Sequence, residues 1–248
     1  MPATPAWPPS SAPRLFVDQP LAAAQSVCLT GNQAHYLLNV MRVKPGDAVK
    51  LFDDVSGDYL ARVDAVGKRD IVLAVEGLTR PRETVPDLWL CAAPIKRARF
   101  DWVAEKACEL GVARFVPVLT ARSVVDKIKP DRLRAQMIEA AEQCERNALP
   151  EIAEAVKLPT LLESWPSSRH LFFADERGGA SLAQSYARHT GPAAILVGPE
   201  GGFTDDENAA IRACPAAVAV SLGPRILRAD TAAVAAIAAW MATGGDWG

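Results

Sequence analysis

Residues 193–203 read AAILVGPEGGF, and residues 217–228 read AVAVSLGPRILR. Each stretch starts as a short, apolar, β-favouring run, ends in Gly-Pro, and is followed by a segment of helical composition. The pattern predicts two strand–loop–helix units close together in the chain. In α/β sheets, ligands bind in the crevice outside the carboxyl ends of such strands. These two loops are therefore the best candidate for a binding site.

The first loop has the composition of a backbone that approaches a ligand closely. Its three glycines, at 198, 201 and 202, permit positive φ angles. Thr204 and Glu207 have the spacing of a capping box. Glycines before a helix would also suit a phosphate, but the acidic residues 205–207 would repel one, and the Gly-Lys-Ser/Thr ending of a P-loop is absent. An uncharged or cationic ligand is favoured, and a tight turn without a ligand is the alternative.

The second loop adds charged side chains to an apolar pair. Arg225 and Arg228 flank Ile226 and Leu227, and arginine is well suited to recognising phosphates and flat bases. Surface salt bridges are the alternative role for both arginines. The segment from 231 to 242 is apolar nearly all round, which indicates a helix buried in the core or in a subunit interface.

Length and composition limit the class of protein. The 248 residues fit one large domain or two small ones, and no apolar run reaches the roughly 18 residues of a membrane span. The proline-rich residues 1–13 lack the features of a signal peptide and are expected to be flexible. Five widely spaced cysteines and three histidines indicate neither disulfides nor a metal site. We expect a soluble protein of the reducing cytoplasm, without metal or membrane.

Charge is unevenly distributed although the net charge is only −2. Between residues 96 and 134 there are ten Lys/Arg and five Asp/Glu, a local excess of five positive charges. Such a block can form a patch that follows a phosphate backbone. A solvated helix face is the alternative.

The order of elements predicts two domains. Residues 14–80 contain one short helix, 32–41, and strands at 49–53, 59–63 and 71–75, as in a small barrel. A polar, proline-bounded linker follows at 81–87. From residue 88, predicted strands (88–92, 114–119, 169–174, 193–197 and 217–222) alternate with helices (99–110 and 131–147), which indicates an α/β sheet covered on both faces.

The two Gly-Pro loops resemble the signature loops of the RsmE family, the bacterial 16S ribosomal RNA (uracil-N3)-methyltransferases of the SPOUT superfamily. The match extends upstream to residues 35–42 (HYLLNVMR), 106–112 (KACELGV) and 141–147 (AEQCERN). The resemblance therefore covers most of the chain in the right order.

The resemblance implies a PUA-like RNA-binding β-barrel at 14–80 and a SPOUT methyltransferase domain at 88–248, an α/β domain with a C-terminal trefoil knot. It implies S-adenosylmethionine as cofactor, 16S rRNA in the small ribosomal subunit as partner, and a homodimer. The reaction would be methylation of N3 of one uridine. The residues expected to bind the cofactor are Leu196, Val197, Gly198, Pro199, Glu200, Gly201, Gly202, Leu222, Gly223, Ile226 and Leu227.

Roles for the charged residues follow from the same chemistry. Arg228 or Arg225 would stabilise negative charge on the uracil carbonyls, and Glu200 or Asp230 would act as the base or orient the arginines. The expected RNA contacts are Arg14, His35, Arg42, Lys96, Arg97, Arg99, Arg122, Arg146 and Asn147.

One departure from the family pattern keeps a second function open. The chain has Ala229-Asp230-Thr231 where the family has Thr-Glu-Thr, which puts an acid/base role of Asp230 in doubt. The alternative function is a non-catalytic rRNA-binding or ribosome-assembly protein that has retained the fold.

Overall fold

The computed structural model describes residues 11–123, 125 and 127–247, and the chain divides into two compact units. The first unit is Met1–Thr84 with Glu142–Ala148, and the second is Val85–Ala141 with Leu149–Gly248. The division after Thr84 falls inside the predicted linker, 81–87. Most of the N-terminal segment predicted to be flexible, residues 1–10, lies outside the described residues. Pro13 is part of the first unit, since its carbonyl accepts the Lys50 N–H at 2.8 Å.

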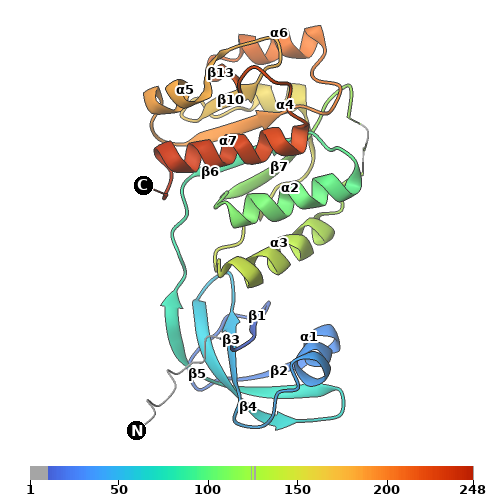
Figure 1. Cartoon of the computed structure of the whole chain (residues 1–248), viewed down its shortest axis with the longest axis vertical. Helices are drawn as coiled ribbons and strands as arrows, with labels where there is room; N and C mark the ends of the chain where they lie inside the picture. Colours follow the sequence, from blue (N-terminus) through green and yellow to red (C-terminus); the bar gives the residue numbers. More distant parts are fainter. Residues whose placement is uncertain (1–10, 124, 126, 248) are drawn as a thin grey trace. The chain divides into compact units, whose positions relative to one another are not determined.

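The first unit is built on a five-stranded sheet with the order β1-β3-β4-β5-β2 (Figure 1). Its strands are β1 (Arg14–Phe16), β2 (Ser26–Thr30), β3 (Ala48–Phe52), β4 (Gly57–Val66) and β5 (Asp70–Pro81). Alternate side chains, among them Leu51, Val63 and Leu73, are fully or almost fully buried in one core. Register shifts between the long strands β4 and β5 bend the sheet around that core.

The single helix predicted at 32–41 consists of two segments. An α-helical turn, α1 (Gly31–His35), continues into a π-helical turn, η1 (Tyr36–Val40). Leu37 is fully buried, but Met41, four residues later, is 38% exposed. The wider π turn changes the angular position of later residues, so Met41 does not share the buried face of Leu37. The next residue, Arg42, has a left-handed φ of 55°.

The second unit contains a parallel sheet with the order β11-β13-β10-β12-β6-β7-β8, with β9 pairing with β7. The strands are β6 (Leu88–Ala92), β7 (Arg114–Leu119), β8 (Glu151–Ile152), β9 (Val156–Lys157), β10 (His170–Ala174), β11 (Ala180–Ser181), β12 (Ala193–Val197) and β13 (Ala217–Ser221). The five longer strands confirm the predicted ones to within a residue. The two-residue strands were not predicted because they are too short to show a period.

Helices cover both faces of this sheet, as the alternation of elements predicted (Figure 1). They are α2 (Arg97–Glu109), α3 (Pro130–Cys144), α4 (Leu158–Glu163), α5 (Leu182–Arg188), α6 (Asp205–Ala213) and α7 (Ala229–Gly244). The apolar helix α7 packs on β12 and β6 and against α2 and α5, while α4 and α6 pack together. Burial on both faces explains why β12 is apolar at every position.

Three residues expected to contact RNA lie inside the first unit instead, which corrects that prediction: Arg146 and Asn147 are buried, and the side chain of Arg14 is 7% exposed. Arg14 is ion-paired with Asp58 at 2.7 Å and donates to the carbonyl of Arg146 at 2.9 Å. Arg146 is 5% exposed, and its guanidinium donates to the carbonyl of Ala148. Asn147 is fully buried and donates to Asp58 at 2.8 Å. Arg14 and Asn147 are thus held by Asp58, a partner distant in the chain that the sequence does not reveal.

Asp53 is a second buried carboxylate in this unit, 2% exposed. Burial alone would raise its pKa, but backbone N–H groups of Ser56, Val55 and Leu21 donate to it, and together these bonds bring the pKa below its ordinary value of 3.8. A carboxylate held by several backbone donors fixes the turn between β3 and β4 and the chain before β2.

We expect Asp53→Asn to lower the free energy of unfolding by about 2 kcal/mol at neutral pH, because an amide cannot accept all of these bonds. The folded-state pKa of Asp53 is lowered, so its contribution is complete above the unfolded-state pKa and is lost as pH falls through the folded-state value. Urea denaturation at pH 7 and below pH 4 measures both effects. Asp64→Asn, at an exposed position of β4, is the control, and equal stability of the two variants at pH 7 would contradict the prediction.

Candidate active site

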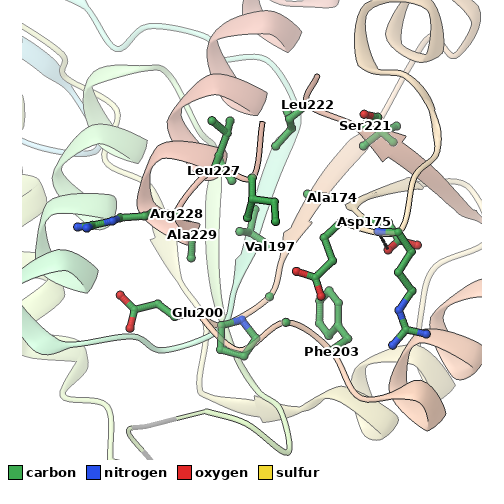
Figure 2. A pocket seen from close by; sticks show the side chains of 18 of the residues that line it. Ala174, Asp175, Val197, Glu200, Phe203, Ser221, Leu222, Leu227, Arg228 and Ala229 are labelled. Carbon is green, nitrogen blue, oxygen red and sulfur yellow. Dashed lines mark hydrogen bonds between the residues drawn. The ribbon is translucent and has the colours of Figure 1, made fainter. Parts of the chain in front are cut away.

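A cavity of about 470 Å³ lies where β10, β12 and β13 end at their carboxyl ends. It is lined by both Gly-Pro loops, by residues 174–177 at the end of β10, and by the start of α7 (Figure 2). Its volume is in the range of pockets that enclose a small-molecule ligand. The structure thus brings together the two loops singled out in the sequence, at the edge of the sheet where α/β proteins bind ligands.

The first loop presents its backbone to this cavity. Gly202 has a left-handed φ of 65°, and a Cβ placed there would lie 2.6 Å from the carboxylate of Glu176. A Cβ at Gly198 would lie 3.0 Å from the ring of Phe203. The capping box is confirmed, since Thr204 Oγ1 accepts the Glu207 N–H at 3.2 Å and Glu207 accepts the Thr204 N–H at 2.9 Å. The loop therefore enters α6 in a defined conformation.

Nine of the eleven residues expected to bind the cofactor line this cavity, while their contact with a cofactor stays a prediction. They are Val197, Gly198, Pro199, Glu200, Gly202, Leu222, Gly223, Ile226 and Leu227. Leu196 is a correction, because it is fully buried with Leu161 and Ile211 in the core on the opposite face of the sheet. Gly201 is another correction, since it does not line the cavity and its carbonyl accepts Arg122 Nη1 at 2.6 Å.

The second loop supplies an apolar wall and two cations. Figure 2 shows Leu222, Leu227 and Val197 on one side of the cavity and Arg228 with Glu200 toward its edge. Arg225 also lines the cavity, and both arginines are exposed. Ile226 is 87% exposed, so it lines only the open rim. The site therefore combines an enclosed apolar part with a charged, open edge.

A third wall, residues 174–177 at the end of β10, was missed in the sequence. Asp175 accepts hydrogen bonds from the Arg177 N–H at 2.9 Å, from Asn208 Nδ2 at 3.2 Å, and from Arg212. Burial would raise the pKa of Asp175, but these bonds outweigh it and the pKa is lowered. The carboxylate thus fixes this wall against α6. The only sequence signal was an apolar run, 170–174, that ends in polar residues and Gly178-Gly179.

Arg99 lines the cavity from α2, whereas the sequence predicts an RNA contact for it. Its Nη1 lies 3.2 Å from Glu200 Oε1 and 3.6 Å from Asp230 Oδ2. Glu200 and Asp230, expected to work with Arg225 or Arg228, are thus ion-paired with a different arginine. Asp230 is in the first turn of α7, beside the cavity.

The other expected RNA contacts occupy different places. Lys96 and Arg97 are exposed at the start of α2, and His35 and Arg42 are exposed in the first unit. His35 is hydrogen-bonded to Asn39 at 3.0 Å. Arg122 is exposed but donates to the first loop, so it has a structural role whether or not it also contacts RNA.

Residues 11–123, 125 and 127–247 contain no group of three or more His, Cys, Asp or Glu placed to hold a metal ion. No helix among them has the length and apolar character required to cross a membrane.

The fold and the site define an α/β domain with a small-molecule pocket at the carboxyl ends of its parallel strands, preceded by a small β unit. Residues 82–241 match the family model of an RNA methyltransferase domain, and residues 29–76 match that of an RNA methyltransferase PUA domain. The chain belongs to this RNA methyltransferase family. Membership confirms the predicted RNA methyltransferase α/β domain and the PUA-like domain, while the SPOUT assignment and the trefoil knot stay predictions.

Relatives and solved structures agree with this assignment. The chain is 30% identical to ribosomal RNA small subunit methyltransferase E of Rickettsia conorii, over 91% of this chain and 93% of that protein. It is 31% identical to the structure of the Neisseria gonorrhoeae protein of the same name bound to S-adenosyl methionine, with a TM-score of 0.86 over 96% of this chain and 100% of that one. A Legionella pneumophila methyltransferase with the same bound cofactor is 27% identical, with a TM-score of 0.85 over 95% of this chain and 99% of that one.

We expect Gly202→Ala to destabilise the protein by about 1–2 kcal/mol, the cost of a left-handed backbone at a residue with a Cβ. It should also weaken binding of S-adenosylmethionine, because Glu176 has to move away from the new methyl group. Thermal unfolding and titration calorimetry measure the two effects. Gly201→Ala is the matched control, since its Cβ would have no neighbour closer than 3.4 Å. Equal losses in both variants would contradict the role of Gly202.

Proposed function

We propose that this protein transfers a methyl group from S-adenosylmethionine to N3 of one uridine in the 16S rRNA of the small ribosomal subunit, and that it acts in the cytoplasm. The observation that carries the proposal is the convergence of the two signature loops on one cavity in a chain of the RNA methyltransferase family. The relatives named small subunit methyltransferases support the choice of rRNA.

The lining residues fit this cofactor. Val197, Leu222 and Leu227 provide apolar surface for an adenine ring, and glycines 198, 202 and 223 leave room for its polar edge to reach the backbone. The carboxylate of Glu176 in the lining favours the positively charged sulfonium of this cofactor. When bound, the cofactor supplies an activated methyl group on a sulfonium sulfur.

The reaction requires three things from the protein. The uracil N3 must lose its proton, the resulting negative charge must be stabilised, and N3 must be aligned with the methyl carbon. Arg228 and Arg225 lie at the open edge of the cavity, where they would face the uracil carbonyls. Glu200 is the base we favour, because it lines the cavity and is 38% exposed, whereas Asp230 lies outside the lining.

Recognition of RNA is assigned to exposed cations beside the site and to the first unit. Lys96 and Arg97 lie next to Arg99 in the chain, at the same end of α2. Contacts of this type to phosphates give affinity without sequence choice. His35 and Arg42 would add contacts from the first unit, in which residues 29–76 match the RNA methyltransferase PUA domain.

A homodimer is part of this proposal. One face of α7, which includes Val234, Ala235 and Ala238, is apolar and only partly buried in the single chain. Ile226 is 87% exposed beside the start of the same helix. A second copy that covered these residues would remove apolar surface from water. Sedimentation of the wild-type protein and of Val234→Glu tests this part separately.

The test of the function is methyl incorporation from labelled S-adenosylmethionine into small subunits lacking the modification, followed by nucleoside analysis. 3-Methyluridine at a single position is the expected product. A different methylated nucleoside would contradict the proposed target atom. Binding of cofactor and RNA without any transfer would favour the alternative, a non-catalytic assembly protein.

We expect Arg228→Ala and Arg225→Ala together to lower kcat by about 10²-fold or more, since donors aimed at developing charge contribute on this scale. The affinity for S-adenosylmethionine should change little, because the arginines act on the uracil. Single-turnover rates and calorimetry separate the two. Arg188→Ala, exposed on α5 and outside the lining, is the control. Turnover within a few-fold of wild type in the double variant would contradict the assignment.

A further inference from the structure

Arg99 connects two walls of the cavity that are distant in the chain. Its Nη1 is 3.2 Å from Glu200, in the loop after β12, and 3.6 Å from Asp230, in the first turn of α7. Arg99 itself comes from the first turn of α2. One guanidinium nitrogen is thus shared by carboxylates from the first and second loop regions.

The packing of the second unit explains why this arginine reaches the site. Helix α2 packs against α7, and Phe100, next to Arg99, is buried against Phe115 of β7 with ring centroids 5.4 Å apart. This anchor fixes the first turn of α2 and leaves Arg99 one-third exposed at the edge of the cavity. Its neighbours Lys96 and Arg97 remain exposed. Burial therefore distinguishes Arg99 from the other cations of this turn.

We propose that Arg99 is a positioning residue of the active site and not an RNA phosphate contact. It ties the first loop to the start of α7 by placing one positive charge between Glu200 and Asp230. The inference rests on the proposed function, since it concerns the same cavity, and it assigns a different role to a residue that resembles its RNA-binding neighbours.

Electrostatics indicates what the tie achieves. Without a cation between them, two carboxylates at this edge repel each other, and each is attached to an element that can move, a loop and a helix start. Arg228 directly precedes α7, so a shift of this helix start also moves the arginine assigned to the uracil. Losing Arg99 should therefore disturb the alignment of base, cation and cofactor more than it weakens RNA binding.

A double-mutant cycle tests the tie. Arg99→Met removes the charge with similar length, Arg99→Lys keeps the charge, and each is combined with Glu200→Gln and with Asp230→Asn. Cofactor affinity, kcat and KM for RNA are measured for the full-length protein. Arg97→Met is the matched control from the same helical turn, and it should raise KM for RNA and reduce the salt dependence of binding by about one ion, as a phosphate contact does.

We expect Arg99→Met to lower kcat by roughly tenfold or more and to weaken cofactor binding several-fold, with Arg99→Lys recovering part of both. The fold-change in kcat and in cofactor affinity caused by Arg99→Met should be at least threefold smaller when Glu200→Gln or Asp230→Asn is already present. Substitutions of interacting residues do not have additive effects. The proposal is overturned if Arg99→Met behaves like Arg97→Met, or if both cycles are additive.

The proposed function fails in a different way. A wild-type protein that binds the cofactor without transferring methyl groups would overturn the proposed function, while the cycle measured on cofactor affinity would still decide the role of Arg99. A wild-type protein that binds no cofactor would overturn both.

Discussion

The order of strands in the second unit is the constraint on which the site depends. β10 lies between β12 and β13, and all three run parallel. Loops that follow parallel strands emerge at the same edge of a sheet, so two loops separated by a helix and a strand in the chain become opposite walls of one cavity. The loop after β10 is then necessarily between them. The positions of all three walls therefore follow from the order of these strands in the sheet.

This order also explains which parts of the site could be predicted from the sequence. Each Gly-Pro loop is recognisable from a local sequence pattern. That pattern allowed four residues that line the cavity to be predicted: Gly198, Gly202, Gly223 and Leu227. The third wall follows a strand placed between the other two by long-range pairing, and no local pattern encodes that position. Leu196 was misassigned because adjacent strand residues point to opposite faces, and only the packed structure shows that Val197 faces the cavity.

Charged residues were predicted less well than apolar ones, for a physical reason. The buried strands are long and apolar enough to be recognised by composition alone. A cation such as Arg14, however, is equally compatible with solvent, RNA or a buried partner, and its partner Asp58 is far away in the chain. Asn147 and Asp58 are 89 residues apart yet hydrogen-bonded in the structure. In the same way, Arg97 and Arg99 look alike in the sequence, and only the packing of α2 separates them.

The residues around Asp58 have a consequence for how this protein is divided. Glu142–Ala148 belongs to the first unit although it follows most of α3 in the chain. Within this segment, Asn147 donates hydrogen bonds to the carboxylate of Asp58 and the carbonyl of Pro81, and it accepts one from the Glu83 N–H. The first unit is therefore not a contiguous module. A gene fragment ending at residue 84 would encode its sheet without the peptide that completes it. Exchange of this domain between proteins by a single recombination event would leave the buried Asp58 short of a partner, so the two units are expected to be inherited together.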